Sequence, residues 1–215
     1  MNIEFPSDAF PQAEIPRTPL TELRDQAGAC TRCPLYGPAT QTVFGEGPED
    51  ARLFFVGEQP GEQEDLAGRP FVGPAGKVFD RALAEAGIAR DLVYVTGAVK
   101  HFKYVPRGKK RIHSKPNAYE IRQCHWWLER ELAAIAPQLV VALGGTAARS
   151  LAGRAVSVLR ERGPALFGAQ AGFITIHPSF LLRLPDERRR AAEYAKFVAD
   201  LKAVRSMVAP AAAAA

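Results

Sequence analysis

Residues 53–61 read Leu-Phe-Phe-Val-Gly-Glu-Gln-Pro-Gly, and this stretch decides the fold. Its first half is an unbroken apolar run, which is typical of a strand buried in a parallel sheet. Glycine and proline then end the strand, an acidic loop follows, and a helical pattern begins near Pro74. Ligands of open α/β sheets bind beyond the carboxyl ends of the strands, so Glu58 and Gln59 are candidate ligand contacts. An ordinary strand-to-helix connection with solvated acids is the alternative.

The rest of the chain alternates between strand-like and helix-like segments. Apolar, β-rich runs occupy residues 52–57, 92–98, 138–143 and 172–176, and helical patterns occupy 74–88, 117–135, 145–152 and 186–204. Thr18-Pro19-Leu20 with Glu22 predicts a capped helix that ends near Gly28. This alternation predicts the α/β class, as a three-layer α/β/α sandwich around a central four-stranded parallel sheet. Residues that follow the first, second and fourth strands should then be neighbours.

Length and composition fit one domain with a sizeable core. The chain has 215 residues, of which 47% are hydrophobic and 24% charged. We expect a single domain over residues 18–205, with tails at 1–17 and 206–215. A net charge of +5 favours a polyanionic partner, and the chain has neither a bilayer-spanning apolar run nor a secretory leader. These features predict a cytoplasmic protein.

The three cysteines are a further signal. Cys30 and Cys33 form a C-x-x-C pair just after a short helix, and Cys124 is the third. Two thiols at this spacing can bind one metal or cluster, whereas a disulfide would leave an odd thiol. A redox C-x-x-C motif would normally follow a strand, which is not the case here. Three unliganded thiols are the alternative.

Three motifs together resemble a known family. Residues 57–76, GEQPGEQEDLAGRPFVGPAG, closely resemble the first active-site motif of the iron–sulfur uracil-DNA glycosylases, related to family 4. His177-Pro178-Ser179, at the end of the fourth strand, matches the second motif of that family. Lys109-Lys110-Arg111-Ile112-His113 resembles the Arg-Ile-His loop peculiar to the UdgX branch, as does the glutamine at position 59. The similarity spans about residues 20–203.

The resemblance implies a role for each matched residue. Glu58 would assist departure of the base, His177 would stabilise the leaving uracil anion, and His113 would attack C1′ of the sugar. Phe71 would stack on the flipped base. The expected substrate-binding residues are Gly57, Gln59, Asp65, Phe71, Gly97 and Ser179. The basic residues Lys109, Lys110 and Arg111 would grip DNA phosphates, although a solvated charge run would explain the lysines alone.

The resemblance also implies an iron–sulfur cofactor. Family-4 enzymes hold a 4Fe–4S cluster with four cysteines, and Cys30, Cys33 and Cys124 match three of them. The fourth position falls on His101 in a Lys-His-Phe-Lys string that UdgX-like proteins share. Imidazole replaces thiolate on cluster iron in Rieske centres, so His101 is the expected fourth ligand.

Gly97 departs from the family pattern. The family normally has an asparagine here, which hydrogen-bonds the edge of uracil and excludes cytosine, and glycine has no side chain to do so. Losing such a contact costs on the order of 1–3 kcal/mol of discrimination. Three explanations stay open: a relaxed base preference, a water or neighbouring side chain that takes the place of the amide, or a deliberately substituted variant.

The expected function is that of a DNA-repair uracil-DNA glycosylase that becomes covalently linked to the abasic site through His113. Its expected partners are uracil-containing DNA, preferentially single-stranded, and free uracil as product; we expect a monomer in the bacterial cytosol or nucleoid. One alternative is a turnover enzyme in which water attacks and His113 only positions DNA. The other is a DNA-binding protein whose excision activity Gly97 has impaired.

Overall fold

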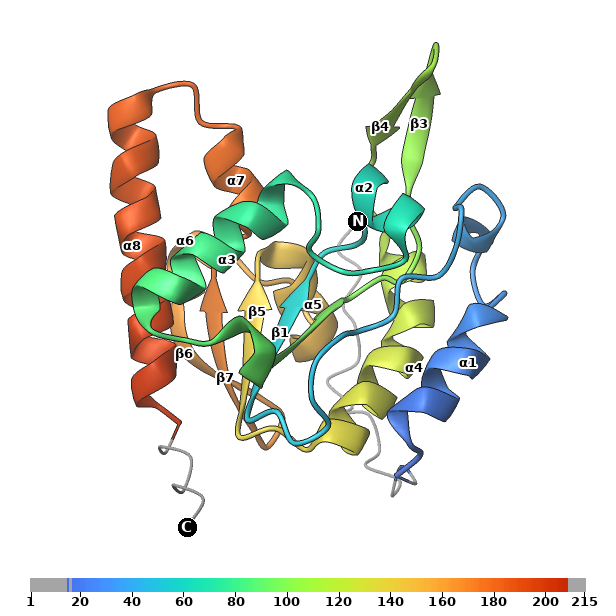
Figure 1. Cartoon of the computed structure of the whole chain (residues 1–215), viewed down its shortest axis with the longest axis horizontal. Coiled ribbons are helices and arrows are strands. Elements are labelled where there is room, and N and C mark those ends of the chain that lie inside the picture. Colours follow the sequence, from blue (N-terminus) through green and yellow to red (C-terminus); the bar gives the residue numbers. More distant parts are fainter. Residues whose placement is uncertain (1–14, 16, 209–215) are drawn as a thin grey trace.

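The computed structural model describes residue 15 and residues 17–208, so most of both predicted tails lies outside the described residues. Its central sheet has the order β2-β1-β5-β7-β6 (Figure 1). The first four strands are mutually parallel, as predicted: β1 (Leu53–Gly57), β2 (Val93–Gly97), β5 (Leu139–Leu143) and β7 (Gln170–Thr175). The predicted α/β architecture is therefore confirmed.

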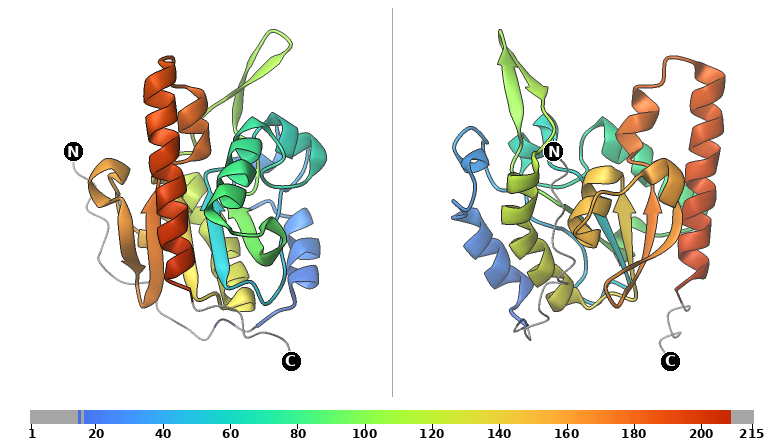
Figure 2. Two further views of the ribbon diagram at one scale, coloured as in Figure 1. Left: turned by 60° about the vertical axis from the view of Figure 1, so that its left-hand side comes forward. Right: turned by 180° about the vertical axis from the view of Figure 1, so that it is seen from behind.

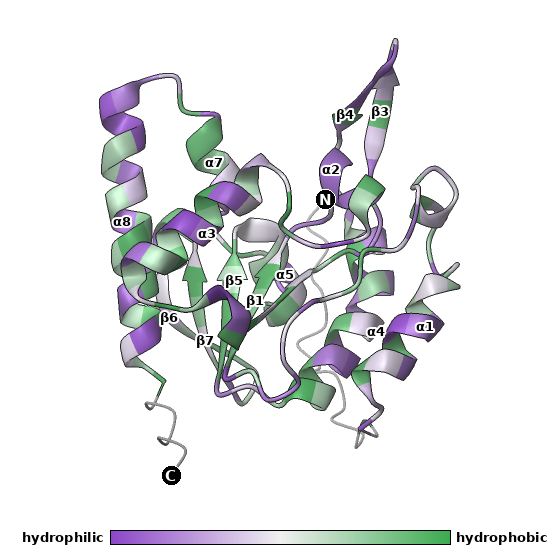
Figure 3. Ribbon diagram, in the orientation of Figure 1, coloured by the Kyte–Doolittle hydropathy of each residue, from purple (hydrophilic) through white to green (hydrophobic). Residues whose placement is uncertain are grey.

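Side chains alternate along each strand and feed two cores, one on each face of the sheet. In β1, Leu53 and Phe55 point into one core, whereas Phe54 and Val56 point into the other. A strand that is buried on both faces can be apolar throughout, which explains the unbroken run at residues 53–56. Figures 2 and 3 show helices on both sides of this largely apolar sheet.

The helices form the two outer layers. The core that contains Phe55 is covered by α3 (Pro74–Ala86), α7 (Pro178–Leu182) and α8 (Glu187–Ser206). The core that contains Phe54 is covered by α1 (Leu20–Gly28), α4 (Ala118–Ile135) and α5 (Gly145–Ala152). The predicted cap of the first helix is wrong: α1 begins after Pro19, which makes no side-chain capping hydrogen bond.

The sheet has a fifth strand that the sequence prediction missed. Strand β6 (Gly163–Phe167) pairs antiparallel with β7 at the edge of the sheet, so the central sheet is mixed and not four-stranded. Its sequence, Gly-Pro-Ala-Leu-Phe, carries two residues that normally interrupt strands. Proline is tolerated there because one side of an edge strand needs no ladder hydrogen bonds.

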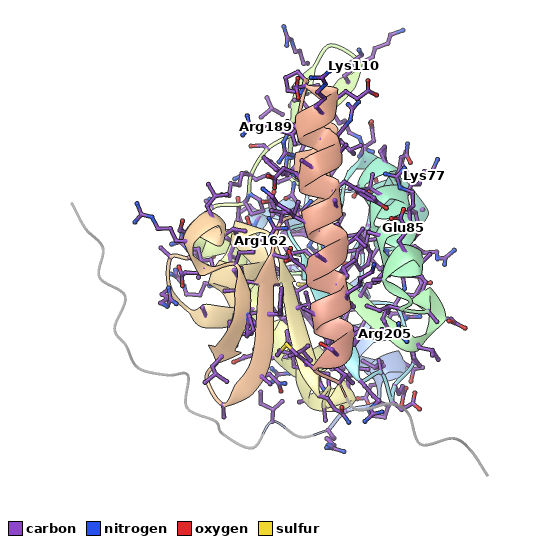
Figure 4. All side chains as sticks on the ribbon, turned by 90° about the vertical axis from the view of Figure 1, so that its left-hand side faces the viewer. Lys77, Glu85, Lys110, Arg162, Arg189 and Arg205 are labelled. Atoms are coloured by element: carbon purple, nitrogen blue, oxygen red, sulfur yellow. The ribbon has the colours of Figure 1, made fainter. Side chains whose placement is uncertain are left out.

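The basic segment predicted as a loop is a β-hairpin. Strands β3 (Tyr104–Arg107) and β4 (Lys110–His113) pair antiparallel around the turn Gly108-Lys109, with Tyr104 opposite His113. A two-residue turn that begins with glycine suits the right-handed twist of a hairpin. The hairpin projects beyond the sheet (Figure 1), and Lys110 lies near its tip (Figure 4). It carries His113 at its base, next to the carboxyl ends of the parallel strands.

Short helical segments complete the connections between these elements. They are η1 (Pro34–Tyr36), α2 (Glu62–Ala67), η2 (Arg90–Leu92) and α6 (Val158–Glu161). Helix α2 lies inside the acidic loop that follows β1, so this loop is more ordered than its sequence suggested.

Candidate functional site

A cavity of about 970 Å³ lies at the carboxyl ends of the parallel strands. It is lined by residues from the ends of β1, β2, β4, β5 and β7, including Gly57, Glu58, Gln59, Phe71, Gly97, His113, Thr146, His177 and Ser179. Residues predicted from four separate stretches thus surround one space. This is the position at which open α/β sheets bind ligands.

Glu58 lies between the sheet and the hairpin. Its Oε1 is 3.3 Å from His113 Nε2, and its Oε2 accepts a 2.6 Å hydrogen bond from Thr146 Oγ1. Burial alone would raise the pKa of Glu58, but the hydrogen bonds from His113 and Thr146 and the nearby imidazoles lower the pKa to about 2. The group is therefore an ionised carboxylate at neutral pH. It is suited to stabilising positive charge and poorly suited to accepting a proton.

His177 is held as a neutral ring in a defined tautomer. Its Nδ1 accepts a hydrogen bond from the backbone N–H of Ser179 at 3.2 Å and lies 2.8 Å from Ser179 Oγ. Burial lowers the pKa of His177 to about 4, against the opposing effect of Glu58. With Nδ1 acting as an acceptor, the ring proton sits on Nε2, which lies beside Gly57 on the floor of the cavity. Nε2–H is thus a fixed donor for an anion.

Phe71 forms an aromatic wall of the cavity. Its ring lies so close to Gly57 that a Cβ at position 57 would come within 2.7 Å of it. The ring is also near-parallel to His177, with 6.1 Å between ring centroids. Phe71 has a φ of 57°, a left-handed backbone that costs a non-glycine residue about 1–2 kcal/mol. The surrounding structure holds this strained residue where a planar ligand could stack on it.

Gly97 faces the cavity from the end of β2, in register with Gly57 on β1. A Cβ at position 97 would lie 2.7 Å from the carbonyl oxygen of Val99, which is backbone and cannot simply rotate away. The Gly97 carbonyl accepts a hydrogen bond from the buried ammonium of Lys100 at 2.8 Å. The β2 side of the cavity is therefore closely packed around a residue that has no side chain.

The side chain of Gln59 contacts the hairpin. Its Nε2 donates to the carbonyl oxygens of Lys103 and Ser114, and its Oε1 accepts from the Lys103 N–H. The sequence prediction assigned Gln59 to the substrate. In the structure its amide already has three backbone partners, although the residue lines the cavity.

Asp65 and Arg111 are paired outside the cavity lining. The carboxylate of Asp65 is fully buried and accepts hydrogen bonds from Thr40 and from Arg111 Nη1, the latter at 2.6 Å. Arg111 also contacts Glu62 at 3.2 Å and lies over the rings of Phe102 and Tyr104. Both residues therefore anchor the hairpin to the loop that follows β1. This leaves Lys109 and Lys110 as exposed basic residues of the hairpin turn.

The three cysteines are neighbours between α1 and α4. Burial raises the pKa of Cys124 to about 12, and charge on Cys33 and Cys30 adds to the shift, which places the three sulfurs in one electrostatic environment. Two N–H groups donate to these sulfurs: Trp127 Nε1–H to Cys30 and the Lys100 backbone N–H to Cys124, both at 3.1 Å. Such donors are expected around cluster thiolates.

His101 is buried at the same end of the molecule. Within the part of the chain that the structure describes, its ring makes no hydrogen bond to a cysteine sulfur. Its Nε2 lies 2.9 Å from Thr42 Oγ1. Among residue 15 and residues 17–208, no three His, Cys, Asp or Glu side chains converge on the position of a single metal ion. A four-iron cluster binds each thiolate through a different iron, so its ligands need not converge on one point. The three cysteines thus fit the donor set of a cluster. His101 could add its Nδ1 as a further ligand without breaking the contact between its Nε2 and Thr42.

Sequence reasoning missed several residues of the cavity, and two of them contact predicted site residues. Thr146 binds Glu58, and Arg183 Nη1 donates to Ser179 Oγ at 2.9 Å, next to His177. Thr146 follows the third predicted strand, so the strand-end rule applied to Glu58 would also have found it. Arg183 lies after a short helix and has no comparable sequence signal.

The chain is similar to known proteins along most of its length. A family model described as the uracil DNA glycosylase superfamily matches residues 44–202. Three similar curated proteins are each named type-4 uracil-DNA glycosylase. The one from Thermotoga maritima is 40% identical over 157 residues, which cover 72% of this chain and 78% of the relative. The one from Sulfurisphaera tokodaii is 31% identical over 192 residues, covering 85% and 84%, and the one from Pyrobaculum aerophilum is 34% identical over 175 residues, covering 77% and 86%.

Among residue 15 and residues 17–208, no helix has both the length and the apolar character needed to cross a bilayer.

Proposed function

Because the chain belongs to the uracil DNA glycosylase superfamily, we propose that it excises uracil from DNA and then bonds covalently to the abasic site through His113. The observation that carries this proposal is the 3.3 Å approach of His113 Nε2 to Glu58 Oε1, at the rim of a cavity that also holds His177 and Phe71. A nucleophile, an anion donor and a stacking surface surround the same space.

Cleavage of the base–sugar bond separates charge, and the cavity has a group for each sign. The electron pair of the C1′–N1 bond leaves with uracil, whose negative charge develops on O2, and the Nε2–H of His177 would donate to that oxygen. The sugar becomes electron-poor at C1′, and the ionised carboxylate of Glu58 would stabilise it. Phe71 would hold the flipped base by stacking.

The capture step then uses a neutral imidazole. A lone pair on a ring nitrogen of His113 forms the new bond to C1′, and the resulting ring cation loses its remaining N–H proton to solvent. Glu58 orients the ring through its contact with Nε2. An N-alkylated imidazole has no easy route to hydrolysis, so the protein would remain on the DNA after one turnover.

The hairpin would contribute the DNA grip. The hairpin projects beyond the sheet and carries the exposed Lys109 and Lys110 near its tip, where Figure 4 labels Lys110, and phosphates of a bound strand could reach them there. A single-stranded substrate would require less work than a duplex, because its base enters the cavity without unpairing. One subunit holds all of these groups, which fits the expected monomer.

The same family membership supports an iron–sulfur cofactor. Cys30, Cys33 and Cys124 would bind a 4Fe–4S cluster, with His101 as the fourth ligand. Such a cluster would tie the segment after α1 to α4 and to the loop after β2. Anaerobically purified protein should be brown and hold about four iron atoms per chain. Colourless, iron-free protein that is folded and active would contradict this part of the proposal.

A hydrolytic enzyme is the second candidate function. It is favoured by the names of the three relatives described above, each a type-4 uracil-DNA glycosylase, and by the half-exposed ring of His113, which water can approach. In this case water attacks C1′ and the protein turns over.

Intact-protein mass after incubation with uracil-containing single-stranded DNA separates the two functions. The proposed function predicts a denaturation-resistant adduct for the wild type and for Ile112→Ala, which changes the neighbouring hairpin residue. His113→Ala should release uracil and form no adduct. Uracil release without adduct in the wild type would establish the hydrolytic function, and an unchanged adduct in His113→Ala would remove His113 as the nucleophile.

A further inference from the structure

The hydroxyl of Thr146 holds the carboxylate oxygen of Glu58 that does not contact His113. Thr146 Oγ1 lies 2.6 Å from Glu58 Oε2, while Oε1 of the same carboxylate lies 3.3 Å from His113 Nε2. An ionised carboxylate can only accept hydrogen bonds, so the threonine hydroxyl is the donor. Each oxygen of Glu58 therefore has its own partner, and the two partners together fix the rotation of the carboxylate.

Thr146 is itself held by a rigid part of the fold. It is the second residue of α5, and only 2% of it is exposed. Gly144 turns the chain from β5 into this helix with a φ of 90°, and its N–H donates to the Thr175 carbonyl at 2.9 Å. The next two residues of α5, Ala147 and Ala148, are fully buried in the core. A β-branched side chain on such a backbone has few rotamers, so its hydroxyl is a donor at a fixed position.

The surroundings of this hydrogen bond favour the anion. Thr146 lies in the first turn of α5, where the positive end of the helix dipole stabilises a nearby negative charge. Burial raises the pKa of Glu58, but the hydrogen bonds from His113 and Thr146 and the charge of His177 outweigh it. Without the hydroxyl, no other group among residue 15 and residues 17–208 donates a hydrogen bond to Oε2.

Resting on the proposed function, we infer that Thr146 is a positioning residue: it fixes the Glu58 carboxylate so that Oε1 meets both His113 and the electron-poor sugar. A hydroxyl, a carboxylate and an imidazole then form one chain, in which the first group orients the second and the second orients the third. No proton leaves Thr146 in either step. The residue acts only through Glu58, in breaking the glycosidic bond and in the capture that follows.

The test removes or retains the hydroxyl at position 146. Thr146→Val and Thr146→Ala both lack it, the valine at nearly unchanged volume, whereas Thr146→Ser keeps it. Thr175→Val is a matched control, because Thr175 is also fully buried and its hydroxyl also donates to a carboxylate, that of Asp200, outside the cavity lining. The readouts are single-turnover uracil release, adduct formation, affinity for uracil-containing single-stranded DNA, and urea unfolding to show that each variant is folded.

Both variants without the hydroxyl should release uracil roughly tenfold more slowly, because they lose a hydrogen bond to a charged group. Adduct formation should slow by at least the same factor, and affinity for the DNA should stay within about threefold of wild type, since the hydroxyl is engaged by Glu58. Thr146→Ser should be within about threefold of wild type in rate, and Thr175→Val should match the wild type. A wild-type rate of release in Thr146→Val and Thr146→Ala, or a serine variant as slow as both, would overturn the role.

A double-mutant cycle separates positioning from a general effect on structure. Adding Thr146→Val to Glu58→Ala should slow uracil release by no more than about twofold, because the carboxylate that the hydroxyl orients is already gone. If Thr146→Val slows release by the same factor with and without Glu58, the residue does not act through the carboxylate and the inference is wrong.

The failure of the proposed function looks different. If the wild type releases uracil and forms no adduct, covalent capture through His113 is wrong, and the release rates of the Thr146 variants still decide whether the hydroxyl positions Glu58. If the wild type forms adduct and the variants without the hydroxyl form it at the same rate, the positioning role alone is wrong.

Discussion

The two sides of the cavity are built in different ways. Glu58 and His177 follow the ends of the parallel strands β1 and β7, where burial and hydrogen bonds set their charge states, and Phe71 packs beside them from the segment between α2 and α3. His113 stands on a projecting hairpin that has no place in the central sheet and is held by side-chain contacts from the loop after β1. In the proposed function, the sheet side would break the glycosidic bond, and the hairpin side would capture the product. The two activities should therefore be separable by mutation.

The largest effect should come from the sheet side. In the proposed function, His177→Ala would remove the donor for the developing uracil anion, and loss of one such donor typically lowers a rate by roughly 10²–10³-fold. Adduct formation should fall by the same factor, because capture follows bond cleavage. Single-turnover uracil release and adduct yield, measured on the same samples, check this. If His177→Ala forms adduct at the wild-type rate, then capture by the hairpin side does not depend on bond cleavage by the sheet side.

Gly97 allows a sharper test of the sheet side. Gly97→Asn would place a Cβ 2.7 Å from the Val99 carbonyl, so we expect it to lower the free energy of unfolding by about 1–3 kcal/mol. Its amide should also raise discrimination of uracil over cytosine by roughly tenfold or more. Gly97→Ala is the matched control, with the same crowding and no amide. Chemical denaturation and competition between two substrates measure both quantities; equal discrimination by the two variants would exclude a base-reading role at this position.

The charge state of His177 predicts how stability changes with pH. Its folded pKa of about 4 lies below the value near 6.5 of an unfolded histidine. The unfolded chain therefore takes up the proton first, and stability is lost as pH falls from about 6.5 to 4. The loss of free energy of unfolding should be about 2 kcal/mol. This value allows for solvent screening of the ring edge that faces the cavity. Urea unfolding at both pH values should show a smaller loss in His177→Gln, and identical losses would contradict the neutral buried ring.

The smallest effect concerns the tip of the hairpin. Lys110→Gln should reduce the slope of log affinity for single-stranded DNA against log salt by about 0.7, the value for one lost phosphate contact. Lys202→Gln, an exposed lysine on α8, should leave the slope unchanged. Binding titrations at several salt concentrations measure this. Equal slopes for Lys110→Gln and the wild type would show that the hairpin tip does not contact phosphate.

The difference between the two sides also explains what sequence reasoning could predict. Local patterns were sufficient for the parallel strands and for placing Glu58 and His177 at strand ends, because apolar runs and glycine punctuation are local signals. The edge strand β6 was missed because its proline and exposed residues do not form an apolar run. The hairpin was not predicted, since charged residues dominate its sequence and such a run is typical of a loop. The partners of Gln59 and Arg111 depend on contacts between segments that are distant in sequence, which no local pattern reveals.

The most direct test of the central claim is to identify the residue that carries the DNA. Wild-type protein is incubated with uracil-containing single-stranded DNA, the adduct is digested with protease and nuclease, and the modified peptide is sequenced by tandem mass spectrometry. We predict a deoxyribose adduct on His113 within the peptide that follows Arg111. An adduct on another residue, or complete uracil release with no modified peptide, would contradict the account.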